Sequence, residues 1–216
     1  LNPGNAELSI KSTLRDGRGV FGEYQIPLRS VTMDAKLASS IIDVASIQAD
    51  TLGGSLRTNG RVVLGGEASM EWTGSGLRLR ELLAARPTDQ PPKMAGIVTT
   101  SGRVRFPLAS PKEGLSGAGD IDIKEGRLVN IPVVSDLVGV MAATGLVQTN
   151  QFNDTFKSPL ILDAKGVTLN GFDLRTPAVH ARGTGSVAFD GTLDMSVNGG
   201  PVEAIQNQLG QFGKIL

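Results

Sequence analysis

The chain has 216 residues and no cysteine, and its 21 Lys and Arg side chains are balanced by 21 Asp and Glu. The lack of cysteine excludes disulfides and thiolate metal sites within the chain. The zero formal net charge gives no indication of a nucleic-acid partner or of a basic one. Glycine is abundant, at 28 residues, whereas aromatic residues make up 4%. With alternating apolar residues, this composition is typical of an all-β chain with many turns.

The sequence contains no candidate for a membrane-spanning helix, since no stretch reaches roughly 18 consecutive apolar residues. The chain begins at Leu1 and not at a methionine. We therefore expect it to be a piece of a longer protein, with any signal or membrane anchor lying upstream.

Period-two alternation of apolar and polar residues dominates the first third of the chain and predicts β-strands. The apolar stripes run over 6–14, 20–28, 31–37, 56–64, 68–72 and 77–79. Asp16-Gly17 is predicted to form a turn between the first two stripes. A proline-rich polar segment at 85–93 is the best internal boundary. It divides the chain into β repeats over 1–86 and 87–216, which we expect to form one continuous sheet.

The alternation continues beyond this boundary, where two breaks predict helices. Strands are expected near 94–100, 102–107, 115–124, 127–132, 158–164, 166–170, 172–176, 178–190 and 192–198. Asn170-Gly171 and Asp190-Gly191 predict hairpin turns, because glycine accepts a positive φ without a Cβ clash. Segments 133–144 and 201–214 lose the alternation and predict two short helices, and Pro201 suits the first turn of the second.

One phrase occurs twice, at 117–128 and at 183–193. Each copy predicts a strand with a face of small and apolar residues, a glycine turn, and the start of a return strand. Within 178–190 the apolar residues fall on odd positions, and polar residues such as His180 and Arg182 fall on even positions. This pattern predicts an antiparallel sheet with one apolar and one wet side. The expected fold is mainly β, a long curved antiparallel sheet that forms a groove or an open sandwich, with about two short helices.

In order along the chain, these phrases resemble the C-terminal region of the AsmA-like family of bacterial envelope proteins. The phrases that carry the resemblance are 53–64, 77–83, 96–104, 117–132, 156–174 and 183–197. Residues 77–83 resemble the family's strand and the short helical turn that follows it. Residues 96–104 resemble the family's next hairpin. The resemblance covers most of the chain and lies in the order of the phrases.

The resemblance implies a periplasmic protein that is anchored in the inner membrane by a helix upstream of this chain. It also implies a groove of apolar side chains that holds or conducts the tails of phospholipid or another acyl lipid, in outer-membrane lipid transport or assembly. The family supplies no catalytic residue, and we expect no enzyme activity, cofactor or metal. The residues expected to contact lipid are Ile121, Ile123, Val179, Ala181, Gly183, Gly185, Val187 and Phe189.

Other interpretations of the same residues remain open. The apolar face could be fully buried in a structural or interaction β-domain that has no lipid ligand. Gly183 and Gly185 could leave room for a lipid tail, or could reflect close backbone packing or a bulge. His180 is the single histidine and is expected on the solvated surface, not in a metal site. A hydrolase is disfavoured, because the chain has no Gly-x-Ser-x-Gly nucleophile motif.

Overall fold

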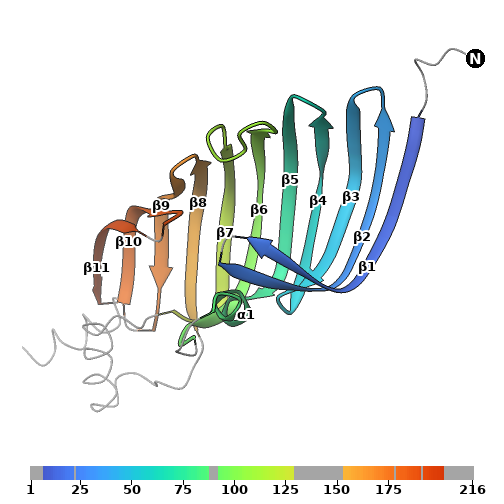
Figure 1. The fold of residues 1–216 in the computed structure, drawn as a ribbon. Coiled ribbons are helices and arrows are strands. Elements are labelled where there is room, and N and C mark those ends of the chain that lie inside the picture. The colour runs from blue at the N-terminus through green and yellow to red at the C-terminus, as the bar shows by residue number, and fades with distance from the viewer. Residues whose placement is uncertain are drawn as a thin grey trace, which may run out of the picture.

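The computed structural model describes residues 7–21, 23–87, 92–128, 153–177, 179–190 and 192–201. They form one open antiparallel sheet of eleven strands, each paired with its neighbours in chain order (Figure 1). The strands are β1 (Glu7–Phe21), β2 (Tyr24–Ala38), β3 (Ile41–Thr51), β4 (Gly54–Val63), β5 (Glu67–Arg78), β6 (Ala95–Pro107), β7 (Ser116–Arg127), β8 (Asp154–Asp163), β9 (Gly166–Arg175), β10 (Val179–Ala188) and β11 (Leu193–Pro201). The short helix α1 (Leu79–Ala84) lies between β5 and β6. The mainly β, curved antiparallel fold is as predicted, and β5 pairs with β6 across the proposed boundary.

Two of the predicted turns are irregularities inside continuous strands. Asp16 has a φ of +53° but lies within β1, which continues to Phe21. Gly171 has a φ of +90° and lies within β9, next to the register shift between β8 and β9. A residue with positive φ can form a bulge within a long strand as well as a turn between two strands. The predictions of turns at Asp16-Gly17 and at Asn170-Gly171 were therefore wrong.

Two further predicted strand boundaries are absent. Residues 95–107 form the single strand β6, so the strands predicted at 94–100 and 102–107 are one strand and the hairpin expected at 96–104 does not exist. In the first copy of the repeated phrase, β7 runs through Gly126 to Arg127, with Glu125 at a φ of +49°. The second copy ends in the hairpin between β10 and β11. There Asp190 Oδ1 accepts a hydrogen bond from Thr192 N at 2.8 Å.

The two predicted helices cannot be compared with the structure. Segment 133–144 lies outside the described residues, and so does 201–214 apart from Pro201, which ends β11. The described helix α1 instead follows Arg78, where the family resemblance implies a helical turn.

The far part of the β1–β2 hairpin, hereafter the hairpin arm (residues 17–21 and 23–27), extends beyond the sheet. Strand β3 pairs with β2 only as far as Leu28, so the arm continues as a two-stranded ribbon. Figure 1 shows this ribbon bending toward α1. At its tip, Gln25 N donates to Ala85 O at 2.8 Å, and Arg86 Nη2 lies 2.7 Å from Glu23 Oε2. The arm therefore joins the first hairpin to the segment that follows α1.

The best-packed part of the sheet lies beside α1. Leu79 from the helix is buried together with Val98, Ile123 and Leu128, and Leu83 packs against this cluster. The helix contacts β5 and β6. The helix therefore covers one end of one face of the sheet, over the Val98–Ile123 pair.

Candidate functional site

One row of side chains crosses all eleven strands without a charged residue. From edge to edge it consists of Ser12, Met33, Ile47, Thr58, Trp72, Gly102, Gly119, Leu160, Leu169, Gly185 and Met195. Directly paired residues in an antiparallel sheet project to the same side. With strands about 4.8 Å apart, this row extends roughly 48 Å along the sheet.

A second row has the same property and lies two residues along each strand, except on β3, where the bulge between Val44 and Ile47 makes the offset three. It consists of Ile10, Ala35, Val44, Gly60, Met70, Val104, Gly117, Leu162, Val167, Val187 and Leu193. Because side chains alternate between faces, both rows lie on the same side of the sheet. We call this side the apolar face. It extends unbroken from β1 to β11.

Two threonine hydroxyl groups on the apolar face donate to backbone carbonyl groups. Thr58 Oγ1 donates to Glu71 O at 2.5 Å, and Thr100 Oγ1 donates to Asp120 O at 2.8 Å. The indole Nε1 of Trp72 in turn donates to Thr100 Oγ1 at 3.3 Å. These polar atoms are therefore satisfied within the sheet, so the face can meet an apolar ligand without leaving them unpaired.

The apolar face is covered by α1 at one end and is most exposed toward the edges of the sheet. In the described residues, α1 packs on β5 and β6, and the tip of the hairpin arm bonds to the segment that follows α1. Val98 and Ile123 beneath α1 are 5% and 7% exposed. In contrast, Val187, Leu193 and Val197 at the C-terminal edge are 38%, 61% and 59% exposed. The face therefore offers solvent-accessible apolar surface away from α1.

The residues predicted to contact lipid differ in how exposed their side chains are. Ile121, Ile123, Ala181, Gly183, Gly185 and Val187 belong to paired rows of the apolar face, and Val179 lies on the same side as Ala181. Phe189 lies in the turn after β10 and is half-exposed. Ile123 and Ala181 are buried, so their side chains offer little surface to a ligand. The exposed members of the set are Val187 and Phe189.

The surroundings of Gly183 fit close packing and not an empty space for a lipid tail. A Cβ built on Gly183 would lie 2.8 Å from Cζ of Phe172, which is 3% exposed. The register between β9 and β10 also shifts between Gly183 and Gly185. The Phe172 ring stacks on Phe156, with centroids 5.7 Å apart. These rings therefore occupy the floor at this point.

The opposite face of the sheet is wet and charged. Its cross-strand ion pairs include Lys36–Glu7 at 2.8 Å, Arg61–Asp43 at 2.8 Å and Lys157–Asp122 at 3.3 Å. The basic side chains of these pairs are more than 60% exposed. Each such pair contributes little to stability. Their effect is to keep this face solvated while the other remains apolar.

The densest charge cluster surrounds Asp173 on β9. Its Oδ1 accepts from Arg175 Nε at 2.8 Å, and its Oδ2 accepts from Arg182 Nε at 3.1 Å and lies 3.0 Å from His180 Nε2. The hydrogen bond from Arg175 is the main cause that holds the pKa of the Asp173 carboxyl well below its usual value, and His180 and Arg182 add to it. The His180 side chain is 35% exposed. Asp173 therefore connects three side chains of β9 and β10 on the wet face.

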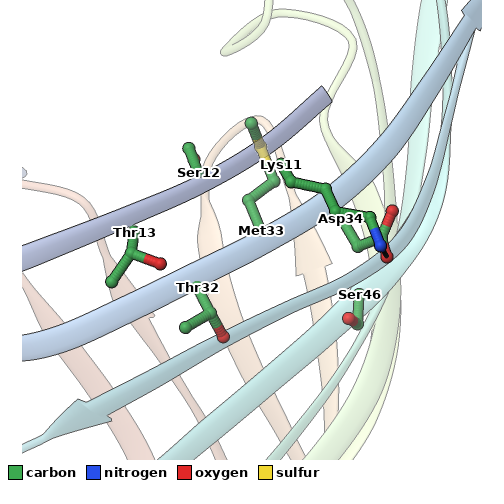
Figure 2. A pocket seen from close by; sticks show the side chains of 7 residues that line it. All are labelled: Lys11, Ser12, Thr13, Thr32, Met33, Asp34 and Ser46. Atoms are coloured by element: carbon green, nitrogen blue, oxygen red, sulfur yellow. Dashed lines mark ion pairs between the residues drawn. The ribbon is translucent and has the colours of Figure 1, made fainter. Parts of the chain in front are cut away.

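A shallow hollow of about 320 Å³ lies over the first three strands. Figure 2 shows its lining, with the Lys11 ammonium beside the Asp34 carboxylate at 3.4 Å. These side chains are 75% and 43% exposed. The hollow is open to water, and its charged groups form one exposed ion pair, so it carries no chemical proposal.

The described ranges contain no group of three or more His, Asp or Glu side chains placed to hold a metal ion. Within the same ranges, no helix combines the length and apolar character needed to cross a membrane.

Trp72 is a central residue of the face that the sequence interpretation did not single out. It is the only tryptophan of the chain, and it occupies the middle of the first row. Its position between the alternating residues Met70 and Gly74 places it on the apolar stripe of β5 and could have indicated its role.

Comparison with protein-family models, curated proteins and solved structures finds no match to this chain.

Proposed function

We propose that this chain is a non-catalytic module that holds or conducts lipid acyl chains along the apolar face of its sheet. The observation that carries the proposal is the pair of uncharged rows that cross all eleven strands and remain partly exposed. A surface of this size, unless covered, is unfavourable in water and is typical of a binding surface.

Acyl chains match this surface physically. Burying a methylene group contributes about 0.8 kcal/mol, so an apolar floor can hold a chain without specific hydrogen bonds. The hydroxyls of Thr58 and Thr100 already donate to backbone carbonyls, which suits a ligand that neither donates nor accepts hydrogen bonds. The opposite face, with its ion pairs, stays in water.

The resemblance to AsmA-like envelope proteins supplies the biological setting of the proposal. In that setting the parent protein is anchored in the inner membrane by an upstream helix, and this chain works in the periplasm. Its ligand is phospholipid or another acyl lipid, and its task is outer-membrane lipid transport or assembly.

Trp72 provides a direct test because it is the only tryptophan and lies on the apolar face. Protein purified without detergent would be loaded with a phospholipid whose acyl chains carry bromine atoms, and then with the same lipid lacking bromine. Bromine quenches indole fluorescence on contact. We expect the brominated lipid to quench Trp72 and the unbrominated lipid to leave its fluorescence intact.

The matched control moves the indole to the other face of the same strand. The double variant Trp72→Phe with Glu71→Trp places the only tryptophan on the wet face, one residue away. We expect this variant to bind as much lipid and to show little quenching. Equal quenching at positions 71 and 72 would mean that lipid association is not confined to the apolar face. Absence of any bound lipid would favour the structural interpretation, in which the face is buried by protein.

A further inference from the structure

The two edges of the open sheet differ in how they are protected. The edge strand β1 carries Lys11, Arg15 and Arg18, and Asp16 introduces a positive-φ irregularity. Its far part bends away as the hairpin arm (Figure 1). Charges, bulges and bends of this kind prevent an edge strand from pairing with another chain.

The opposite edge strand, β11, lacks these devices over most of its length. Asp194 is its only charged residue, and Pro201 stands at its last position. Leu193, Met195 and Val197 alternate along it and are 61%, 39% and 59% exposed. The register of β10 with β11 shows no shift from Val179–Pro201 to Val187–Leu193. Within the described residues, no further strand pairs with the outer edge of β11. A regular strand with an apolar side and an unpaired backbone edge is a template for strand addition.

The sequence of β11 is complementary to itself when two copies run antiparallel. If Met195 lies opposite Met195 of the second copy, Leu193 lies opposite Val197 and Val197 opposite Leu193. On the other face, Asp194 then lies opposite Ser196, so the two carboxylates do not face each other. A shift that centred the pairing on Asp194 would place like charges directly opposite, which is unfavourable. The Met195 register pairs apolar residues with apolar residues on one side of the joined sheet.

We propose that the edge of β11 is a self-association site, at which a second copy of this chain adds its own β11 antiparallel about a twofold axis through Met195. A twofold interface of this kind closes on itself and gives a dimer, not a fibre. It joins the apolar faces of the two copies into one surface. Pairing one short strand buries less area than the roughly 1,200–2,000 Å² of a standard interface, so the dimer dissociates on dilution. The inference does not depend on the proposed lipid function.

Analytical ultracentrifugation of the 216-residue chain over a wide dilution series tests the site. We expect a monomer–dimer equilibrium, and we expect Val197→Lys to raise the dissociation constant about tenfold or more, because the charge would sit in the apolar seam. Leu14→Lys is the matched control, since Leu14 is 51% exposed and lies on the opposite edge strand. It should leave the equilibrium unchanged. Circular dichroism would verify that both variants remain folded.

A chain without cysteine makes the register testable as well. Met195→Cys should form a disulfide-linked dimer under mild oxidation, because directly paired Cβ atoms lie about 4.5–5.5 Å apart. Ser12→Cys, at the other end of the same row, should not. A chain that stays monomeric at its highest soluble concentration overturns the proposal. So does a dimer that Val197→Lys leaves intact, or equal cross-linking through positions 12 and 195.

Discussion

The indole ring of Trp72 lies over the backbone of Gly119, two strands away across the sheet. A Cβ built on Gly119 would lie 2.9 Å from Cζ2 of the ring, and the ring also lies over Gly102 on the strand between them. The two glycines therefore allow a large aromatic ring to lie close to the sheet surface instead of projecting from it. For this reason the Trp72 side chain projects little from the centre of the apolar face.

Gly119→Ala should destabilise the protein by about 1–3 kcal/mol, the usual range for overpacking. The added methyl group would press against the Trp72 ring and the neighbouring β6 backbone. Urea unfolding at neutral pH measures the loss, and a shift in Trp72 emission reports movement of the ring. Gly200→Ala is the control, because no atom lies within 4 Å of the added Cβ. It should change stability by no more than about 0.5 kcal/mol. Equal effects at both positions would contradict the packing argument.

Val187→Asp and Ile123→Asp compare the open and covered ends of the apolar face. Val187 is 38% exposed, so its aspartate can remain hydrated, and we expect a folded protein that binds less lipid. Ile123 is 7% exposed beneath α1, so an unpaired carboxylate there should destabilise the fold by several kcal/mol, out of a typical total of about 5–15 kcal/mol. Thermal melting and lipid extraction from the same samples measure both quantities. If Val187→Asp unfolds as readily as Ile123→Asp, the C-terminal part of the face is buried and the structural interpretation is favoured.

Asp154→Ala should destabilise the protein by about 1–3 kcal/mol, the effect of leaving a buried hydrogen-bonding group unpaired. The buried Asp154 accepts a hydrogen bond from Leu128 N at 2.7 Å through its Oδ2. Asp120→Ala, at an exposed position on β7, is the control. Chemical denaturation compares the two variants with the parent chain. A loss at position 120 as large as that at 154 would argue against a specific role for this hydrogen bond.

Asp173→Asn should lower stability at pH 7 by about 1 kcal/mol or less, since the cluster is partly exposed. The pKa of Asp173 is lower in the folded state than the unfolded value near 3.9. The carboxylate contribution is therefore fully present above about pH 4 and is lost as the pH falls toward the folded pKa. The difference between parent and variant, measured by denaturation at pH 7 and again near pH 3, should shrink in acid. A difference that grows on acidification would contradict the assignment.

The alternation of residue types was sufficient to predict a sheet with one apolar and one wet side. Side-chain direction along a strand depends only on position parity, so His180 and Arg182 could be separated from Ala181 without knowledge of the partners. The number and length of strands could not be read in the same way. Asp16 and Gly171 have the positive φ that suits a turn, yet each lies within a long strand, and only pairing with the neighbouring strands distinguishes these cases.

The hairpin arm and the packing of the Trp72 ring over Gly102 and Gly119 were beyond local patterns for a different reason. The arm is fixed by the hydrogen bond between Gln25 N and Ala85 O, which joins residues far apart in the chain. A backbone hydrogen bond leaves no signature in residue type. The space for the Trp72 ring likewise arises where three strands bring Gly102 and Gly119 beneath it. These features become visible only once the strand register is known.

The serial pairing of the strands has a consequence for how such a protein can change in size. Each strand contacts the strands before and after it in the chain. Inserting or deleting one hairpin would therefore leave the remaining pairings intact and alter the breadth of the sheet by two strand spacings, about 10 Å. Gene duplication within such a chain would lengthen the uncharged rows in steps of two residues. The length of the sheet can therefore change during evolution while the pairing of the remaining strands stays the same.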